Sequence, residues 1–285
     1  MRASEQHRYS LVIDADRGIP MNEDQSQGTM LCRNANTNAT TSDNLSFQQE
    51  EWFDRLPLLS EEFLQRYHRP LVTVSYAQSV DGSIAARNRQ QLRLSSHQSM
   101  VLTHRIRAAS DAVIIGINTL LVDDPRLTVR HIEGKSPQPI VLDSNLRFPE
   151  RSRLLERTDH RCWLACTDKN DPGRVDKVKK QGVKVIRCQG DNSGKVDLPN
   201  LLHLLGQRGI RSIMVEGGSQ VITSFIETRL VDKLIVTITP NLVGGLAVLG
   251  RPAACNGSLL RLNQVTYQSC GPDLILWAQP QWQEI

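Results

Sequence analysis

The sequence predicts a three-layer α/β domain with a mostly parallel sheet and an antiparallel C-terminal edge. From residue 69 onward, short apolar segments of strand length alternate with helical segments, and two of the helical segments run into glycines that stop them. Helices that connect apolar strands make the strands parallel and cover both faces of one sheet. The last two strand-like segments are joined by Gly271-Pro272 with no helix between them, so we expect an antiparallel hairpin there.

The individual elements follow from apolar runs, helix-capping residues and glycine stops. Strands are expected at 71–77, 112–116, 139–143, 162–167, 183–188, 212–216, 232–239, 260–269 and 274–278. Helices are expected at 96–109 with Ser95 or Ser96 as the N-cap, at 172–181, at 198–207 and at 219–228. Because ligands of such sheets bind beyond the carboxyl ends of the strands, the residues that follow each strand are candidates for function.

Residues 1–68 are predicted to be a polar, largely disordered extension, and residues 69–285 to be the sheet domain. Asn, Gln, Ser and Thr supply 16 of the 30 residues from Met21 to Glu50. Such a composition buries too little apolar surface to offset the entropy of ordering. One or two short helices are expected near 47–67, with Ser60 as an N-cap.

The net charge of +4 is divided unevenly along the 285 residues. Residues 1–69 carry 7 basic against 11 acidic side chains, whereas residues 70–285 carry 27 against 19. A basic body suits an anionic small substrate or cofactor. The aromatic content of 5% offers few stacking platforms for single strands, so no nucleic-acid partner is expected.

The sequence does not predict a membrane-spanning, a secreted or a metal-binding protein. No apolar run approaches the roughly 18 residues of a membrane span. The first thirty residues contain acidic side chains and lack an apolar core, unlike a secretory signal or a transit peptide, so we expect a cytoplasmic protein. The six cysteines form no CxxC pair, which predicts packed thiols and no metal site, with Cys162 and Cys166 in the core.

The clearest candidate for chemistry is the segment from Glu216 to Gln220, where a strand runs through Gly217 and Gly218 into a helix. Two glycines let the backbone approach a ligand closely, and the N–H groups of a helix start favour an anion. A tight strand-to-helix turn requires the same glycines, and the spacing alone leaves both interpretations open.

A second candidate follows the strand at 112–116. Thr119 and Asp123 are four residues apart, so they share one face if a short helix forms before Pro125 and could then hydrogen-bond one ligand. A helix cap and a turn are the alternatives for these residues. Arg130 could clamp a phosphate, because a guanidinium holds two oxygens at once.

Two further strand ends carry polar residues, Asp81-Gly82 and Asp143-Ser144.

The sequence does not predict a zinc deaminase, a serine hydrolase or a zinc protease, since the chain has no zinc-deaminase pattern, no GxSxG elbow and no HExxH helix. His97 and His104 share a helix face at a spacing of seven, and without a third ligand we expect both to be surface residues.

Taken together, these segments resemble the reductases of riboflavin biosynthesis: the stand-alone diaminopyrimidine-phosphate reductases and the reductase domain of the bifunctional bacterial deaminase/reductase. The resemblance covers about residues 69–279 and keeps the order of the family. The matching pieces are Arg69-Pro70, Ser79-Val-Asp81-Gly82, Ile106-Arg107-Ala-Ala-Ser-Asp-Ala112, Gly116-Ile-Asn-Thr119, Asp123-Asp-Pro-Arg-Leu-Thr-Val-Arg130, Val141-Leu-Asp143-Ser144, Val215-Glu-Gly-Gly218, Leu230-Val-Asp-Lys-Leu234 and Pro240-Asn-Leu-Val-Gly-Gly245.

The resemblance implies a dihydrofolate-reductase-like fold, NADPH as cofactor and a homodimer that reduces the ribosyl group of a pyrimidine ribosylamino 5′-phosphate to ribityl. It implies that the cofactor is held by Ala77, Thr119, Asp123, Ser144, Gly217, Gly218, Ser219, Gln220, Val221, Ile222, Thr223 and Ser224. It implies that the substrate is held by Arg107, Leu127, Arg130 and Glu216. Glu216 is also the nearest candidate for a catalytic acid, although an orienting role is favoured.

Two alternatives remain open at this point: a reductase of dihydrofolate, a pterin or another heterocycle on the same fold, and a non-catalytic nucleotide-binding homologue. The sequence does not decide between the diamino and the deaminated pyrimidine as substrate.

Overall fold

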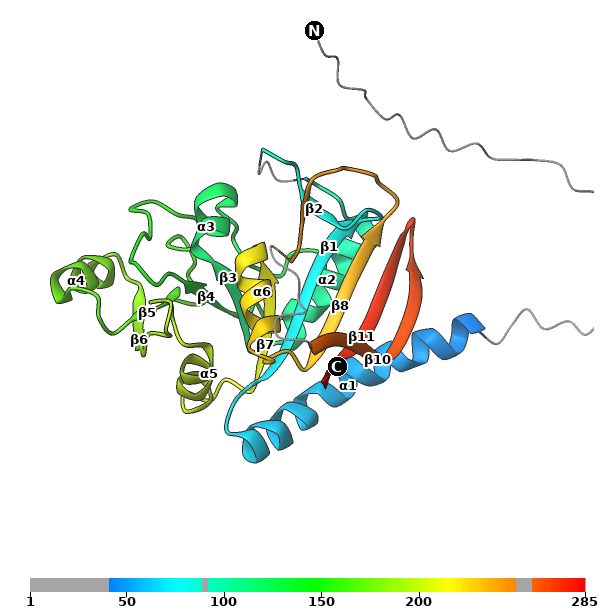
Figure 1. Ribbon diagram of the computed structural model, residues 1–285, viewed down its shortest axis with the longest axis horizontal. Helices are drawn as coiled ribbons and strands as arrows, with labels where there is room; N and C mark the ends of the chain where they lie inside the picture. Colours follow the sequence, from blue (N-terminus) through cyan, green and yellow to red (C-terminus); the bar gives the residue numbers. More distant parts are fainter. Residues whose placement is uncertain (1–40, 89–91, 250–257, 285) are drawn as a thin grey trace, which may run out of the picture. The chain divides into compact units, whose positions relative to one another are not determined.

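The computed structural model of the chain describes residues 41–88, 92–249 and 258–284 (Figure 1). Of the polar tract expected to be mobile, residues 21–50, the part up to residue 40 lies outside the described residues, whereas residues 41–50 belong to a helix.

The described residues form a nine-stranded sheet in the order β10-β11-β8-β1-β7-β3-β4-β5-β6. Its strands are β1 (Leu71–Ser79), β3 (Ala112–Gly116), β4 (Gln138–Leu142), β5 (Trp163–Thr167), β6 (Lys184–Cys188), β7 (Ser212–Gly217), β8 (Lys233–Thr239), β10 (Ser258–Cys270) and β11 (Asp273–Glu284). The β10–β11 and β11–β8 pairs are antiparallel, and the other neighbours are parallel. The predicted fold class is therefore confirmed.

The central strands are apolar on both faces because both faces are covered. All five residues of β3 are buried, and Val72 and Val74 of β1 have no exposed surface. In register, Val74 lies opposite Val215 of β7 and Leu234 of β8. An uninterrupted apolar run, rather than alternation, is what a strand buried on both faces requires.

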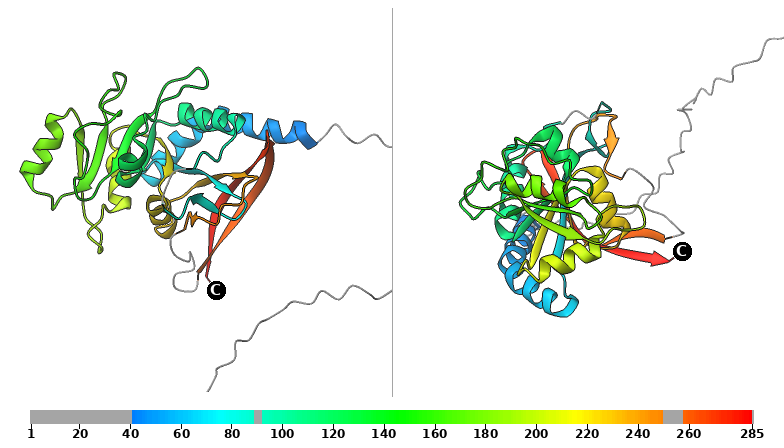
Figure 2. Two further views of the ribbon diagram at one scale, coloured as in Figure 1. Left: turned by 90° about the horizontal axis from the view of Figure 1, so that it is seen from above. Right: turned by 90° about the vertical axis from the view of Figure 1, so that its left-hand side faces the viewer.

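Helices form the two outer layers (Figure 2). They are α1 (Thr41–Tyr67), α2 (His97–Ala109), α3 (Ile117–Asp123), α4 (Pro172–Lys180), α5 (Leu198–Gly206) and α6 (Ser219–Glu227). Side chains of α5 and α6 pack in one apolar cluster, whereas α3 and α4 share a second and α2 contributes to a third. Within the described ranges, no helix is long and apolar enough to cross a membrane.

Helix α1 is continuous over 27 residues, where the sequence suggested one or two short helices near 47–67. Pro57 lies inside it, and Ser60, expected as an N-cap, instead donates its hydroxyl to the Pro57 carbonyl at 3.0 Å. Trp52 and Phe53 contact the ring of Trp277 on β11, with centroids 5.4 and 6.3 Å apart. This packing against the sheet domain offsets the backbone hydrogen bond that an internal proline removes.

The structure tests the expectations for the start of α2, for two cysteines and for His104. Ser96 is the N-cap of α2, and Cys162 and Cys166 are buried, both as expected. The expectation that His104 is a surface residue is wrong, because its side chain has no exposed surface. The face it shares with His97 is covered at His104 by the segment around Arg130, whose backbone N–H bonds the ring.

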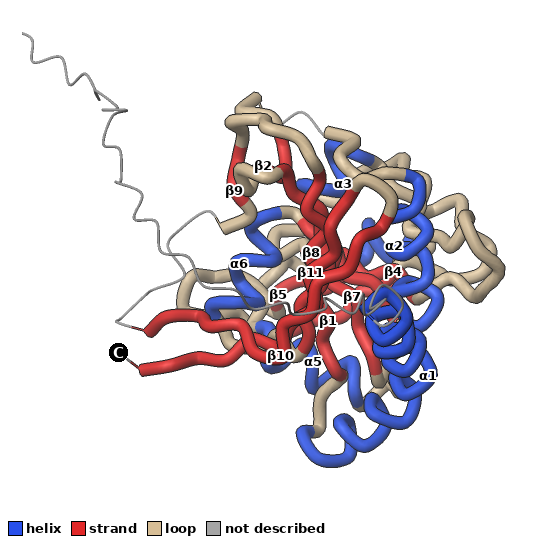
Figure 3. Tube along the Cα trace, turned by 90° about the vertical axis from the view of Figure 1, so that its right-hand side faces the viewer, coloured by secondary structure: helices blue, strands red, loops and turns tan. Residues whose placement is uncertain are grey.

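Two features at the sheet margins were not predicted. A two-stranded sheet pairs β2 (Ser83–Ala85) with β9 (Leu246–Ala247). The long β10–β11 hairpin reaches past the main sheet, since only Leu274–Ala278 of β11 pair with β8 (Figure 3). Short strands and strand overhangs depend on distant partners, and for that reason periodicity does not reveal them.

Candidate active site

Four adjacent strands bring the candidate residues to one edge of the sheet. In the order β1-β7-β3-β4, their carboxyl ends carry Ala77, the segment after Glu216, α3 and Ser144. The parallel pairings put these ends at the same edge. The sequence named the strand ends, and the strand order places them beside one another.

The glycine turn, Gly217-Gly218, joins β7 directly to α6 through a cis peptide bond. Gly217 has φ +148°, and a Cβ there would meet no atom within 4 Å. A Cβ on Gly218 would lie 3.0 Å from Thr119 Oγ1. No side chain caps the start of α6, whose N-cap is Gly218. The turn is thus open at its first glycine and tightly packed at its second, and both interpretations from sequence apply to it.

Thr119 ties α3 to the glycine turn. The Gly218 N–H donates to Thr119 Oγ1 at 2.8 Å, and Asn118 Nδ2 donates to Gln220 Oε1 at 3.3 Å. The short helix expected before Pro125 is present as α3. Asp123 ends this helix, and partial burial raises the pKa of its carboxyl.

A cavity of about 430 Å³, here called the arginine pocket, lies beside this edge. Its lining carries four guanidinium groups and an apolar floor. The lining residues are Arg107, Pro125, Arg126, Leu127, Arg130 and Arg153. Four cations around one cavity form an anion site, and guanidinium groups match the oxygens of a phosphate.

The lining of the arginine pocket includes three residues that were not predicted as site residues, Pro125 and two arginines. Arg126 lies inside the matched motif between Asp123 and Arg130, so its position could have drawn attention. Arg153 is an exposed residue between the buried Ser152 and Leu154, in a segment with no motif of its own. It is anchored by Asp124, whose Oδ1 accepts the Arg153 N–H at 3.0 Å.

The arginine pocket meets the glycine turn at a buried ion pair. Arg107 Nε lies 2.5 Å from Glu216 Oε1, and Nη2 lies 2.7 Å from Oε2. Burial lowers the pKa of Arg107, but the neighbouring carboxylate more than offsets it, so the net shift is upward. Of the predicted substrate residues, Leu127 is 1% exposed and Arg130 is exposed at the rim.

The remaining predicted cofactor residues differ in exposure: Gln220 is exposed, whereas Ser144, Ser219 and Ser224 are half-buried. Ser144 Oγ accepts the Val196 N–H at 3.0 Å. In α6, the side chains of Val221, Ile222 and Thr223 are buried against the core. A ligand at this helix would therefore meet the backbone of the first turn and the side chains of its outer face.

No cluster of three or more His, Cys, Asp or Glu side chains suited to a metal ion occurs in the part of the chain that the structure describes.

Fold and site together define an α/β protein with a mostly parallel sheet and an arginine-lined pocket beside a glycine turn at the strand ends. Comparison with known families narrows this class, because the model of the RibD C-terminal domain matches residues 70–276. The chain belongs to this family, and the resemblance to the riboflavin-biosynthesis reductases is confirmed.

Two relatives illustrate the similarity. The 2,5-diamino-6-ribosylamino-4(3H)-pyrimidinone 5′-phosphate reductase of Archaeoglobus fulgidus is 38% identical over 199 residues, covering 66% of this chain and 87% of that protein. The riboflavin biosynthesis protein RibD of Aquifex aeolicus is 31% identical over 223 residues, covering 77% of this chain and 61% of that protein.

Solved structures agree with this family. The riboflavin biosynthesis reductase Rib7 of Saccharomyces cerevisiae superposes with a TM-score of 0.62 at 26% identity, covering 77% of this chain and 98% of that one. Acinetobacter baumannii RibD gives a TM-score of 0.65 at 24% identity, covering 75% of this chain and 58% of that one. The similarity to the Acinetobacter baumannii protein shows a shared fold.

Proposed function

We propose that this protein is an NADPH-dependent reductase of riboflavin biosynthesis that reduces the ribosyl group of a pyrimidine ribosylamino 5′-phosphate to ribityl. Family membership and relatives named as pyrimidinone 5′-phosphate reductases support an oxidoreductase of this type. The observation that carries the proposal is the arginine pocket, which joins the glycine turn through the Arg107–Glu216 pair.

The substrate phosphate fits the arginine pocket. Arg126, Arg130 and Arg153 supply guanidinium groups, whereas the charge of Arg107 is already balanced by Glu216. Arg153 is itself 4.0 Å from an Asp124 carboxylate oxygen, and a phosphate dianion among these guanidinium groups is attracted strongly in a partly enclosed site. The predicted substrate residues Leu127 and Arg130 both line this pocket.

The residues present also fit a dinucleotide cofactor. The open backbone at Gly217 allows close approach, and the α6 start has no side-chain cap to compete for its N–H groups. Ala77, Thr119, Asp123, Ser144 and residues 217–224 would hold the cofactor, although the N–H groups of Val221 and Ile222 already donate to the Gly218 carbonyl, at 3.0 and 3.1 Å. Bound NADPH would supply the hydride, and the protein would supply alignment.

Glu216 is proposed to orient the substrate. The N-glycosidic aminal of the substrate can open to an imine, which accepts a hydride at the sugar C1′ and a proton from water at its nitrogen and becomes a ribityl amine. Both oxygens of the Glu216 carboxylate already accept hydrogen bonds from Arg107, so the group is held as an acceptor rather than as a proton donor. Arg107 thereby fixes the carboxylate beside the pocket.

The decisive experiment mixes the purified protein with NADPH and each candidate pyrimidine 5′-phosphate and follows the absorbance of the reduced nicotinamide. Oxidation with one of the two pyrimidines supports the proposal and identifies the substrate. No oxidation with either, or turnover with dihydrofolate, contradicts it. Parallel assays with NADH test the cofactor preference through kcat/KM.

We also propose the homodimer that the family resemblance implies, and the cytoplasmic location that was expected from the sequence alone. Light scattering of the full-length protein measures the mass of the assembly, and a monomer at assay concentration would contradict the dimer. Imaging of a tagged full-length chain in its own cell tests the location.

A further inference from the structure

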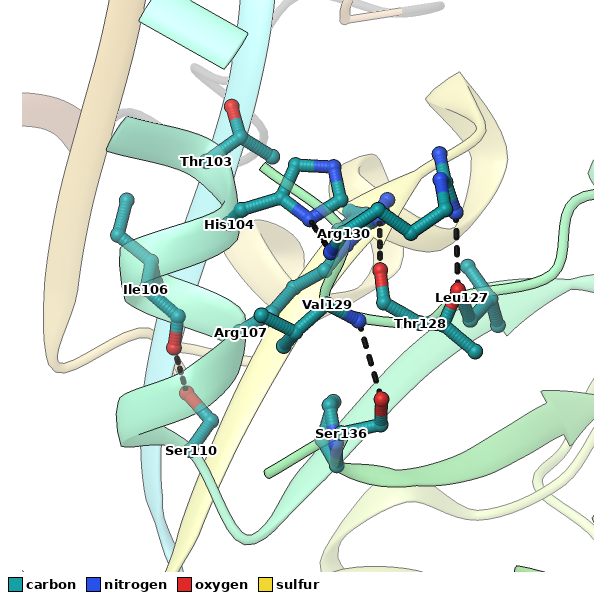
Figure 4. A network of polar contacts seen from close by, with 12 residues as sticks. Thr103, His104, Ile106, Arg107, Ser110, Leu127, Thr128, Val129, Arg130 and Ser136 are labelled. Carbon is teal, nitrogen blue, oxygen red and sulfur yellow. Dashed lines mark hydrogen bonds and ion pairs between the residues drawn. The ribbon is translucent and has the colours of Figure 1, made fainter. Parts of the chain in front are cut away.

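The segment 124–130 supplies most of the wall of the arginine pocket and has no regular secondary structure of its own. Residues outside this segment hold its backbone by hydrogen bonds. Arg107 Nη1 donates to the Thr128 carbonyl at 3.1 Å, and the Val129 N–H donates to Ser136 Oγ at 3.0 Å (Figure 4). A wall of this kind keeps its shape only while those outside groups hold it.

Arg157 Nη1 also donates to the Leu127 carbonyl, at 3.3 Å, and a further external contact is made by His104 of α2. Its Nδ1 accepts the backbone N–H of Arg130 at 2.9 Å, and Figure 4 shows the ring directly above that peptide. His104 lies one turn before Arg107 on the same helix, so α2 holds the segment at two places. The Arg130 side chain leaves this anchored peptide and reaches the pocket rim, where its Nη1 donates to Thr128 Oγ1 at 3.0 Å.

The surroundings of His104 keep its ring neutral. An Nδ1 that accepts a hydrogen bond carries no proton, so the proton of the neutral ring is on Nε2. Burial, together with the charges of Arg107, Arg130 and His131, lowers the pKa of His104 to about 4. Nε2 is buried and has no hydrogen-bond partner in the described structure, while the ring of His131 packs edge-on at 4.6 Å between centroids.

We propose that His104 is a positioning residue for substrate binding, which sets the Arg130 guanidinium at the arginine pocket by fixing the Arg130 backbone through Nδ1. This inference rests on the proposed function, since it assigns the pocket to the substrate phosphate. Position 104 requires a neutral hydrogen-bond acceptor for the Arg130 N–H. A lysine or arginine at this position would add a cation without an acceptor, and a leucine would leave the Arg130 N–H unpaired.

The wild-type protein provides the first test. Ring ¹⁵N spectra at neutral pH should show His104 with Nδ1 unprotonated and Nε2 protonated. Hydrogen exchange should show a protected Arg130 amide. A ring protonated on Nδ1, or an Arg130 amide that exchanges as fast as an open loop, overturns the proposal without any variant.

Two variants at His104 give the second test. His104→Asn keeps an acceptor near the position of Nδ1, and His104→Leu keeps only bulk. We expect His104→Leu to raise the KM for the phosphorylated pyrimidine by about fivefold to a hundredfold, the range for a buried N–H left unpaired. NADPH affinity should change less than twofold, and His104→Asn should recover most of the substrate KM.

A double-mutant cycle with Arg130→Ala separates positioning from general stability. If His104 acts through Arg130, adding His104→Leu to Arg130→Ala should change the substrate KM by less than about twofold. Additive losses, equal losses in the Asn and Leu variants, or a parallel loss of NADPH affinity overturn the proposal.

Inorganic phosphate serves as a probe that does not depend on turnover. Calorimetric titration should show weaker phosphate binding to His104→Leu than to wild type and His104→Asn. If the protein turns over no pyrimidine but this difference is present, the proposed function fails and the role of His104 stands. Equal phosphate affinities in wild type and His104→Leu overturn the role of His104 whatever the turnover.

Discussion

Arg107 and Glu216 form a bidentate ion pair across 109 positions of sequence, with Nε–Oε1 at 2.5 Å and Nη2–Oε2 at 2.7 Å. Both side chains are largely buried, at 9% and 14% exposure. The pair joins α2 to the end of β7 and therefore connects the pocket wall to the glycine turn. Breaking such a pair by removing one partner leaves an uncompensated buried charge.

Replacing the Glu216 carboxylate tests whether this group orients the substrate. Glu216→Gln keeps the shape and one acceptor, so we expect the substrate KM to rise at least about tenfold while kcat falls by less, because no proton transfer is lost. Steady-state kinetics across pH measure both constants. If turnover instead slows by about a hundredfold or more and its pH profile changes, Glu216 acts as a general acid.

Arg130→Ala should damage use of the phosphorylated substrate much more than cofactor binding. Hydrogen bonds to a charged group contribute about 1.5–3 kcal/mol, so kcat/KM should fall about tenfold to a few hundredfold. Arg153→Ala should act in the same direction, since Arg153 lines the same pocket. The matched control is Arg151→Ala, which removes an equal charge from an exposed residue outside the pocket lining.

The dephosphorylated pyrimidine completes that comparison. Its kcat/KM should be equally low with wild type and with Arg130→Ala, because this substrate has no phosphate for Arg130 to bind. If Arg130→Ala impairs both substrates to the same extent, the arginine supports the segment rather than the phosphate, and Arg107 becomes the first choice for that contact.

Thr119 offers a test of the cofactor side. Thr119→Val removes the acceptor for the Gly218 N–H, whereas Thr119→Ser keeps it. We expect NADPH to bind about tenfold more weakly to the valine variant and nearly normally to the serine variant, because a loosened glycine turn no longer presents its backbone in one arrangement. Fluorescence titration measures both. Equal affinities in the two variants would mean that this bond does not shape the cofactor site.

The sheet could be predicted from sequence because buried parallel strands carry their own signal: β3 is apolar at all five positions. Helix α5 ends at Gly206, one residue before the predicted end at 207. The arginine pocket could be predicted only in part. Arg130 stands in a motif, but Arg153 reaches the pocket through the Asp124 side chain, a contact between residues that no local pattern links. His104 was misplaced for the same reason, since its partner is a backbone N–H 26 residues away.

Helix α1 should contribute to stability but not to turnover. Deleting residues 1–40 is expected to leave both kcat and Tm unchanged, because Asn, Gln, Ser and Thr supply half of residues 21–40 and such a tract has no core to join. Trp52→Ala, in contrast, removes a ring packed on Trp277 and should lower the free energy of unfolding by about 3 kcal/mol. Thermal melting and activity of the two proteins check this. A large loss of either quantity in the deletion would show that the tract is docked.

The pH dependence of stability should carry a contribution from His104. Its pKa is lowered from 6.5 to about 4 in the folded protein, through burial and the charges of Arg107, Arg130 and His131. Between pH 6.5 and about 4 the unfolded chain therefore binds the extra proton, and the free energy of unfolding falls as pH falls. The contribution is complete above pH 6.5, and its slope is at most about 1.4 kcal/mol per pH unit.

Urea unfolding of wild type and His104→Asn at several pH values isolates this contribution, because the carboxylates titrate in both proteins. Asparagine has no proton to gain in this range, so its curve should lose stability less steeply below pH 6.5. Parallel curves would mean that the folded protein protonates His104 as readily as the unfolded chain does. In that case the ring could not remain a neutral acceptor for Arg130 at acid pH.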